Sequence, residues 1–98
     1  MQSHNYFVYI ITNPGKTVLY VGVTNDLMTR LDQHKANRGK PGTFAGRYYC
    51  YQLLYYERYT FVQHAIVREK ELKLLGREQK MELIKSENPY LRFLKVDD

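Results

Sequence analysis

The stretch YFVYIITNPGKTVLYVGVTNDLMTRLDQH, residues 6–34, carries most of the information about the fold of this chain. Two runs rich in Val, Ile, Tyr and Thr, residues 6–12 and 17–23, flank the segment NPGK at 13–16. Proline fixes φ at one turn position, and glycine accepts the positive φ expected next, while β-branched and aromatic residues suit a pleated surface. The stretch therefore predicts a β-hairpin that leads directly into a helix.

Past the hairpin, the sequence predicts three helices and a third strand. Thr24 or Asn25 can cap the first helix, whose first turn holds Asp26, and Thr60 can cap the second. Gly76 stands where a C′ glycine would end that second helix. The predicted elements are a helix to about residue 36 or 37, an aromatic-rich strand over 48–57, and helices over 61–75 and 77–86.

These elements predict one α+β domain spanning residues 1–98, with a core of about 6–88. The chain is long enough for one hydrophobic core. Because a hairpin comes first, we expect a small three-stranded, at least partly antiparallel sheet flanked by helices, in the order strand, strand, helix, strand, helix, helix. Residues 89–98 form a C-terminal tail that we expect to dock on the body, with Asp97 and Asp98 frayed.

The composition limits the classes of function. A net charge of +5 and a pI near 9.4 favour a polyanionic partner, although the charge alone is equally typical of a solvated surface. Cys50 is the single cysteine, so one chain cannot build a disulfide framework or a thiolate zinc site, and we expect it to pack as a small hydrophobe. The sequence shows no signal peptide and no apolar run long enough to cross a bilayer, so cytoplasmic residence is the default expectation.

A basic segment, RGKPGTFAGR at residues 38–47, interrupts the helical pattern. Glycine and proline punctuate it, and Arg38, Lys40 and Arg47 surround the single aromatic residue Phe44. This composition predicts a flexible basic loop.

Charged side chains interrupt two predicted apolar helix faces. Leu27, Arg30, Leu31 and His34 recur at i, i+3, i+4 and i+7, so Arg30 and His34 share or border the stripe that faces the core. Glu69 lies within the stripe of the second long helix, which is made by Val62, Ala65, Ile66 and Leu72. Burying an ionised group without a partner costs several kcal/mol, so this placement needs a reason.

Two interpretations fit these charges. In the first, Arg30 and Glu69 pair beneath the sheet, or Arg30 extends from the edge of its stripe to solvent. In the second, both line a cleft, where Glu69 holds a hard divalent metal and Arg30 presents its planar fork to a phosphate. His34, one turn after Arg30, would then act as a proton acceptor or phosphate contact, although a lone helical His is more often a surface residue.

Tyrosine is the other unusual feature, since ten of the 98 residues are Tyr. Most of them are expected to be structural. Tyr9 and Tyr20 differ because both lie on the predicted hairpin before the Arg30 helix. Gly22 shares the strand face of Tyr20 and would leave an open space there, which indicates a β-bulge or, as the less favoured interpretation, close approach of a ligand.

The ordered set of these motifs resembles the GIY-YIG nuclease superfamily over nearly the whole chain. The similarity is greatest to the small stand-alone branch that resembles the N-terminal nuclease domain of the bacterial excision-repair nuclease, the excinuclease. The matching elements are Val8-Tyr9-Ile10, Tyr20-Val21-Gly22, Arg30, His34 and Glu69. Two positions depart from the pattern: Phe7 replaces the first glycine, and Val23 replaces a lysine, which removes one cationic phosphate contact.

The resemblance implies metal-dependent hydrolysis of DNA phosphodiester bonds. Glu69 would hold Mg²⁺ or Mn²⁺, Tyr20 would deprotonate the attacking water and pass a proton toward His34 or solvent, Arg30 would stabilise the transition state, and Tyr9 would orient water or phosphate. The expected nucleic-acid contacts are Gly22, Lys35, Arg38, Lys40, Arg47 and Asn88. The implied substrate is branched, flapped or single-stranded DNA in repair or recombination, cut by a monomer or weak dimer that is directed by DNA structure or by a repair-protein partner.

Two alternatives belong to other classes of function. The chain could be a nucleic-acid-binding or repair-accessory module with weak or no cleavage, or a protein-interaction domain whose basic face is incidental. The complete set of Tyr9, Tyr20, Arg30 and Glu69 favours the nuclease, because a carboxylate that faces phosphate repels DNA unless a metal intervenes.

Overall fold

The computed structural model describes residues 4–96 and has the α+β architecture predicted from the sequence. Its three strands form one antiparallel sheet in the order β2-β1-β3, with β1 in the centre. The strands are β1 (Tyr6–Thr12), β2 (Leu19–Thr24) and β3 (Gln52–Tyr59). The helices are α1 (Leu27–Ala36), α2 (Phe44–Arg47), α3 (Val62–Leu74) and α4 (Arg77–Glu87).

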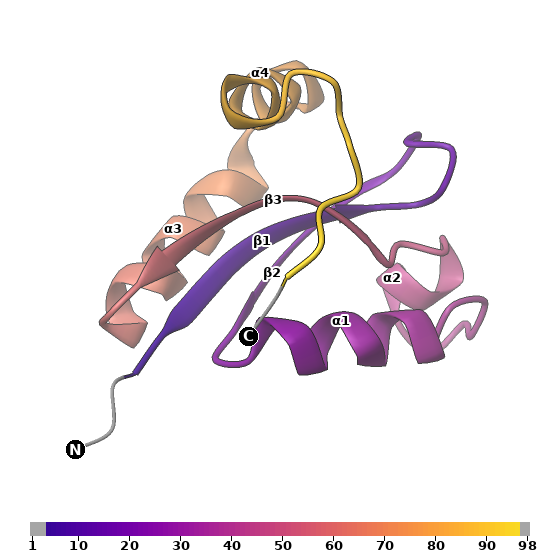
Figure 1. Cartoon of the computed structure of the whole chain (residues 1–98), viewed down its shortest axis with the longest axis horizontal. Coiled ribbons are helices and arrows are strands. Elements are labelled where there is room, and N and C mark those ends of the chain that lie inside the picture. Colours follow the sequence, from indigo (N-terminus) through magenta and orange to yellow (C-terminus); the bar gives the residue numbers. More distant parts are fainter. Residues whose placement is uncertain (1–3, 97–98) are drawn as a thin grey trace.

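Helices cover both faces of the sheet. In Figure 1, α3 and α4 lie on one side of the sheet and α1 and α2 on the other. Because β1 is central and covered on both faces, residues 8–12 are all buried, and successive side chains enter opposite cores. The core beneath α3 and α4 contains Val8, Ile10, Val21, Leu54, Tyr55, Ala65, Leu72 and Ile84. The core beneath α1 contains Tyr9, Ile11, Leu27, Ala45, Cys50 and Leu53.

The hairpin turn differs from its predicted geometry. The N–H of Lys16 donates to the carbonyl of Asn13 at 2.9 Å, and Lys16 takes the left-handed conformation, φ 59°, that was expected at glycine. The Asn13 side chain accepts from the N–H groups of Thr17 and Val18 at 2.8 and 3.0 Å. These two donors are therefore used locally, which explains why β2 begins at residue 19 instead of 17.

Asp26 caps α1, so the prediction of Thr24 or Asn25 as the cap was wrong. Asp26 accepts a hydrogen bond from the N–H of Thr29 at 3.1 Å, and this bond lowers the pKa of its exposed carboxyl group. Thr24 stabilises the turn before the helix, because its hydroxyl oxygen accepts from the N–H of Asp26 at 3.1 Å. The helix therefore begins at Leu27, with Asp26 as its N-cap.

The basic segment 38–47 contains a one-turn helix that the sequence prediction missed. Thr43 caps α2 by accepting from the N–H of Gly46 at 3.0 Å, and the N–H of Gly39 donates to the Gly46 carbonyl at 2.7 Å. A β-carbon on Gly46 would come within 2.5 Å of the Lys40 carbonyl oxygen, so only glycine permits this closure. The predicted third strand accordingly starts late, at residue 52.

Two helix ends also differ from prediction. Phe61 occupies the N-cap of α3 and makes no side-chain cap bond, so Thr60 is not the cap. Gly76 begins α4 instead of ending α3, and its N–H donates to the Gln79 side chain at 3.0 Å. Within the predicted α3 stripe, Val62 and Ile66 are exposed.

A charged cluster joins α3 to β3. Arg68 donates to both carboxylate oxygens of Glu57, at 2.9 and 3.1 Å, and the hydroxyls of Tyr55 and Tyr59 donate to the same carboxylate. Burial opposes ionisation of Glu57, but the bonds from Arg68 and the two tyrosines outweigh it and lower the pKa of this carboxyl. This Glu57–Arg68 clamp sets the position of α3 against the sheet.

The C-terminal segment returns to the sheet (Figure 1). The N–H of Leu94 donates to the carbonyl of Leu53 at 2.8 Å, and the ammonium of Lys16 lies 5.0 Å from the centre of the Phe93 ring. The predicted fraying of Asp97 and Asp98 falls outside the described residues. In the described part of the chain, no helix combines the length and apolar character needed to span a membrane.

We predict that Glu57→Gln destabilises the protein by about 1–3 kcal/mol at pH 7, because a half-buried acceptor of three side chains loses its charge. The pKa of Glu57 is lower in the folded state, so this contribution is complete above the unfolded carboxyl pKa of about 4.3 and is lost as the pH falls through the folded value. Urea unfolding at pH 7 and at acidic pH measures both effects. Glu71→Gln, an exposed partner of Arg68, is the control, and equal losses in both variants would contradict the clamp.

Candidate functional site

Fully buried Tyr9 of β1 and partly buried His34 of α1 form the centre of the candidate site. The Tyr9 hydroxyl lies 2.8 Å from Nε2 of His34, and the two rings pack edge to face with centroids 5.7 Å apart. Tyr9 has no exposed surface. It therefore joins the central strand to the helix that carries Arg30.

The charge states of this pair follow from its surroundings. Burial raises the pKa of Tyr9 to about 12, although the neighbouring Arg30 guanidinium opposes the rise. Burial, and secondarily the positive charge of Arg30, lowers the pKa of His34. At neutral pH the pair is consequently a protonated phenol hydrogen-bonded to an uncharged imidazole, and the imidazole tautomer decides which of the two donates.

Tyr20 and Arg30 lie beside this pair, at a depression of about 250 Å³ in the surface. The Tyr20 ring is half-buried and packs edge to face on His34, with centroids 5.8 Å apart. Arg30 precedes His34 by one turn of α1, so both side chains lie on the same face of the helix. The depression is lined by Tyr20, Arg30, Gln33, His34, Asn37, Thr43 and Ala45.

Glu69 is a largely buried carboxylate on α3. Its side chain is only 17% exposed, and one carboxylate oxygen lies 3.3 Å from the ammonium of Lys73. Its negative charge adds a small upward contribution to the pKa of Tyr9, after burial and Tyr20, so the two groups interact electrostatically. Among the residues described, Arg30 and Glu69 do not form an ion pair with each other, and the direct pairing considered from the sequence is not present.

The small number of possible metal ligands near Glu69 limits which metal ions this carboxylate could bind. Within residues 4–96, no group of three or more His, Cys, Asp or Glu side chains is arranged to hold an ion. A single carboxylate is compatible with Mg²⁺, which keeps several waters and completes its shell with phosphate oxygens. The same set is unsuited to a structural zinc ion, which needs four protein ligands.

Gly22 has a packing role instead of leaving the predicted open space. It lies opposite Tyr9 in the β1–β2 pair, and a β-carbon there would come within 2.3 Å of the Tyr9 hydroxyl. The β1–β2 register is regular at Gly22, and the irregularity in the sheet falls between Ile10 and Ile11 opposite β3. The expected bulge at Gly22 is therefore wrong, and the buried glycine provides room for the Tyr9 ring.

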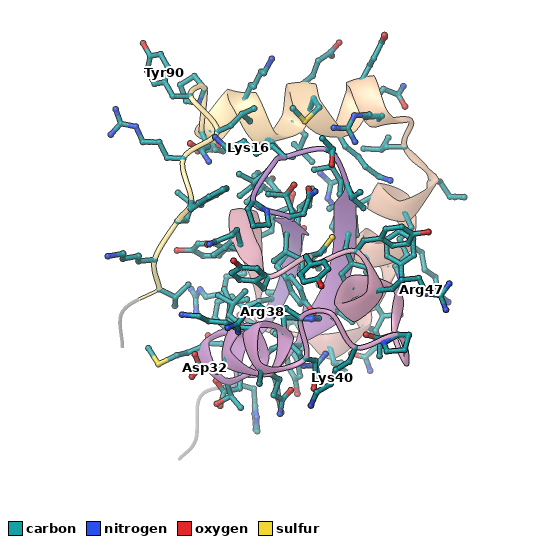
Figure 2. The ribbon with its side chains drawn as sticks, turned by 90° about the vertical axis from the view of Figure 1, so that its right-hand side faces the viewer. Lys16, Asp32, Arg38, Lys40, Arg47 and Tyr90 are labelled. Atoms are coloured by element: carbon teal, nitrogen blue, oxygen red, sulfur yellow. The ribbon has the colours of Figure 1, made fainter. Side chains whose placement is uncertain are left out.

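The predicted nucleic-acid contacts separate into two groups. Lys35, Arg38, Lys40 and Arg47 are exposed, and Figure 2 shows the last three around α1 and α2 on one side of the molecule. Asn88 lies elsewhere: it is buried, and its amide donates to the carbonyls of Leu54 and Arg92 at 3.0 and 2.9 Å. The Asn88 side chain is thus committed to holding the C-terminal segment.

Sequence reasoning missed the residues that complete the outer wall of the depression. Gln33, Asn37 and Thr43 carry no motif of their own, and only the folding of segment 38–47 onto α1 brings them together. Two exposed aromatic residues close to the depression had a detectable signal, since Phe44 lies within the basic segment and Tyr48 directly follows it. That pattern is typical of nucleic-acid surfaces.

Comparisons with known proteins agree with this fold and motif order. Residues 5–82 match the model of the GIY-YIG catalytic domain. A UPF0213 protein of Staphylococcus epidermidis is 36% identical over 80 residues, which cover 81% of this chain and 93% of the relative. A UPF0213 protein of Staphylococcus aureus is 35% identical over 85 residues, covering 87% of this chain and 98% of the relative.

A solved structure is similar as well. The solution NMR structure of a UPF0213 protein from Bacillus halodurans superimposes with a TM-score of 0.55 and 26% identity, covering 88% of each chain. The match to the GIY-YIG domain model, over residues 5–82, includes both strands of the hairpin and the helices that carry Arg30 and Glu69. From the domain match and these relatives, we conclude that the chain belongs to the GIY-YIG family.

Proposed function

We propose that this protein is a metal-dependent endonuclease that hydrolyses DNA phosphodiester bonds. The GIY-YIG domain indicates a nuclease, a class of hydrolase that acts on DNA and generally depends on a divalent metal ion. The relatives are named only as UPF0213 proteins, so the specific reaction is our inference from the residues.

The observation that best supports the proposal is that Tyr20, Arg30 and His34 line one depression and that Tyr9 is hydrogen-bonded to His34. Tyr9 comes from β1, Tyr20 from β2, Arg30 and His34 from α1, and Glu69 from α3. The depression beside Tyr20, Arg30 and His34 has room for a phosphate group. A purely structural core has no need for these polar groups, since apolar side chains would pack there at lower cost.

The proposed roles follow from charge and position. Arg30 binds the scissile phosphate with its guanidinium fork and stabilises the negative charge that grows in the transition state. Tyr9 remains protonated at neutral pH, so it can donate a hydrogen bond, and its bond to His34 orients both rings. Glu69 would hold Mg²⁺ or Mn²⁺, which when bound supplies Lewis-acid stabilisation of phosphate charge and activates water.

Tyr20 is the proposed general base. Its ring borders the depression, whereas Tyr9 is fully buried, so Tyr20 is the tyrosine with access to an attacking water. His34 already engages Tyr9 through Nε2. Of the two routes considered from the sequence, His34 or solvent, we therefore assign the proton leaving Tyr20 to solvent in the depression.

We further propose that the domain, residues 1–98, acts on DNA structure or through a repair-protein partner, in repair or recombination. The exposed cations Lys35, Arg38, Lys40 and Arg47 supply phosphate contacts, which position DNA without reading its sequence.

A DNA-binding module without cleavage is the second candidate. The ion pair between Glu69 and Lys73 favours it, because a neutralised carboxylate could lie near DNA without a metal. The two functions differ in whether the wild-type protein cuts DNA, and in whether substitution of Glu69 abolishes that cut.

We predict that Glu69→Gln abolishes cleavage of a panel of single-stranded, flapped and branched DNA in Mg²⁺ or Mn²⁺ while leaving binding intact. The amide keeps the shape of the side chain but loses the charge that holds the metal. Gel assays measure cutting, and fluorescence anisotropy measures binding. Glu82→Gln on α4 is the matched control. Cutting by Glu69→Gln at the wild-type rate, or an uncut panel at high wild-type concentration, would refute the nuclease.

We also predict that Arg30→Gln lowers the cleavage rate by roughly 10²–10³-fold, as expected for loss of one transition-state donor. The same change removes a positive charge beside His34 and should raise the pKa of its imidazole toward the ordinary value of about 6.5. NMR titration of the His34 ring measures this second effect without any substrate. An unchanged His34 titration would contradict the proposed proximity.

A further inference from the structure

An aromatic surface stands beside the candidate site on α2. Phe44 and Tyr48 are 50% and 43% exposed, and their rings are in contact, with centroids 4.8 Å apart. We call these two residues the α2 platform. Exposing two adjacent aromatic rings on one helical turn forgoes the stabilisation that their burial would give.

The platform continues the ring packing of the site itself. The Phe44 ring stacks on Tyr20, with centroids 6.1 Å apart and an interplanar angle of 24°. The residues on either side of Phe44, Thr43 and Ala45, line the depression next to Arg30. A group that stacks on the platform would thus lie directly beside a phosphate held by Arg30.

The backbone beneath the platform is held in place before any ligand binds. Ala45 is buried, and its carbonyl accepts from the N–H of Cys50 at 2.8 Å. Gly46 is tied to Gly39 and to the Thr43 side chain. A surface that is ordered in advance loses less entropy on binding.

Positive charge lies near the platform. Figure 2 shows Arg38, Lys40 and Arg47 around α1 and α2, and none of them forms an ion pair with a carboxylate among the described residues. Arg47 makes one side-chain bond, at 3.3 Å, to the carbonyl of Pro41. Arg38 donates to the carbonyl of Lys35 and lies over the Tyr51 ring, 5.7 Å from its centre. Aromatic faces beside cations that have no carboxylate partner are the combination that binds single-stranded nucleic acid, with bases on the rings and phosphates on the cations.

We propose that the α2 platform stacks an unpaired nucleobase of the DNA strand that is cut, next to the phosphate at Arg30. The substrate class is then DNA with an unpaired segment at the cleavage point. In an intact duplex, both faces of each base are covered by neighbouring bases, and a one-turn helix is too short to read a groove. This inference rests on the proposed nuclease function and names its substrate class.

The test is a binding measurement without metal, so that cleavage has no part in it. Fluorescence anisotropy in EDTA measures the binding of three nucleic acids: a single-stranded DNA, its duplex, and an RNA of the same sequence as the single strand. Each is titrated with the wild-type protein and with the variants Phe44→Leu, Tyr48→Leu and Phe44→Trp. Phe61→Leu, a change at another exposed phenylalanine, is the matched control. Quenching of 2-aminopurine in the single-stranded DNA reports stacking directly.

We expect the single-stranded DNA to bind more tightly than the duplex or the RNA. Phe44→Leu and Tyr48→Leu should each weaken its binding by roughly 5- to 150-fold, which corresponds to about 1–3 kcal/mol per stacked base, and should reduce the quenching. Phe44→Trp should retain binding and quenching, and Phe61→Leu should change neither. Circular dichroism of each variant verifies that it is folded.

Several results would overturn the inference. These are equal binding of single strand and duplex by wild type, equal weakening of both by Phe44→Leu, unchanged binding by the platform variants, or tighter binding of the RNA. Failure here is separable from failure of the nuclease proposal. Metal-dependent cutting that Glu69→Gln abolishes would uphold the nuclease even if the platform variants bind normally, whereas stacking without any cutting would uphold the platform alone.

Discussion

The part-buried hydrogen bond between Tyr9 and His34 is the contact on which the candidate site depends. Tyr9 belongs to the central strand, so its ring can lie nowhere except in the core, and Gly22 opposite it supplies the room. The hydroxyl needs a partner there, because an unsatisfied buried polar group costs about 1–3 kcal/mol. His34 satisfies it, and in doing so holds α1 in the rotation that turns Arg30 toward Tyr20. A polar contact inside the core thereby orients the charged group at the surface.

The Glu57–Arg68 clamp has the corresponding role on the other face of the sheet. It anchors α3 to an edge strand through a bidentate charged contact, and Glu69 is the next residue on that helix. Consecutive helical side chains point about 100° apart, so fixing Arg68 against β3 also fixes the direction of Glu69. The proposed metal ligand and the proposed phosphate ligand thus come from helices on opposite faces of the sheet, and a part-buried polar contact holds each helix.

The proposed functions share a common basis in this geometry. The depression at Arg30 is formed by α1 and α2 together, and the residues that frame it on α2 also present the aromatic platform. A tightly closed glycine-rich segment therefore links the proposed phosphate binding to the proposed base stacking. The exposed cations around it add attraction for DNA that weakens with salt and is independent of sequence.

Local sequence determined the strands, the long helices and the order of the motifs, because β-branched runs and helical periodicity report local backbone preference directly. It also determined the identities of Tyr9, Tyr20, Arg30, His34 and Glu69. Tertiary structure alone decided how these residues meet: which tyrosine is buried, that Gly22 makes room for a ring, that His34 faces Tyr9, and that residues 38–47 close into α2. The physical reason is that each of these outcomes depends on contacts between residues far apart in the chain, and periodicity within one segment carries no information about them.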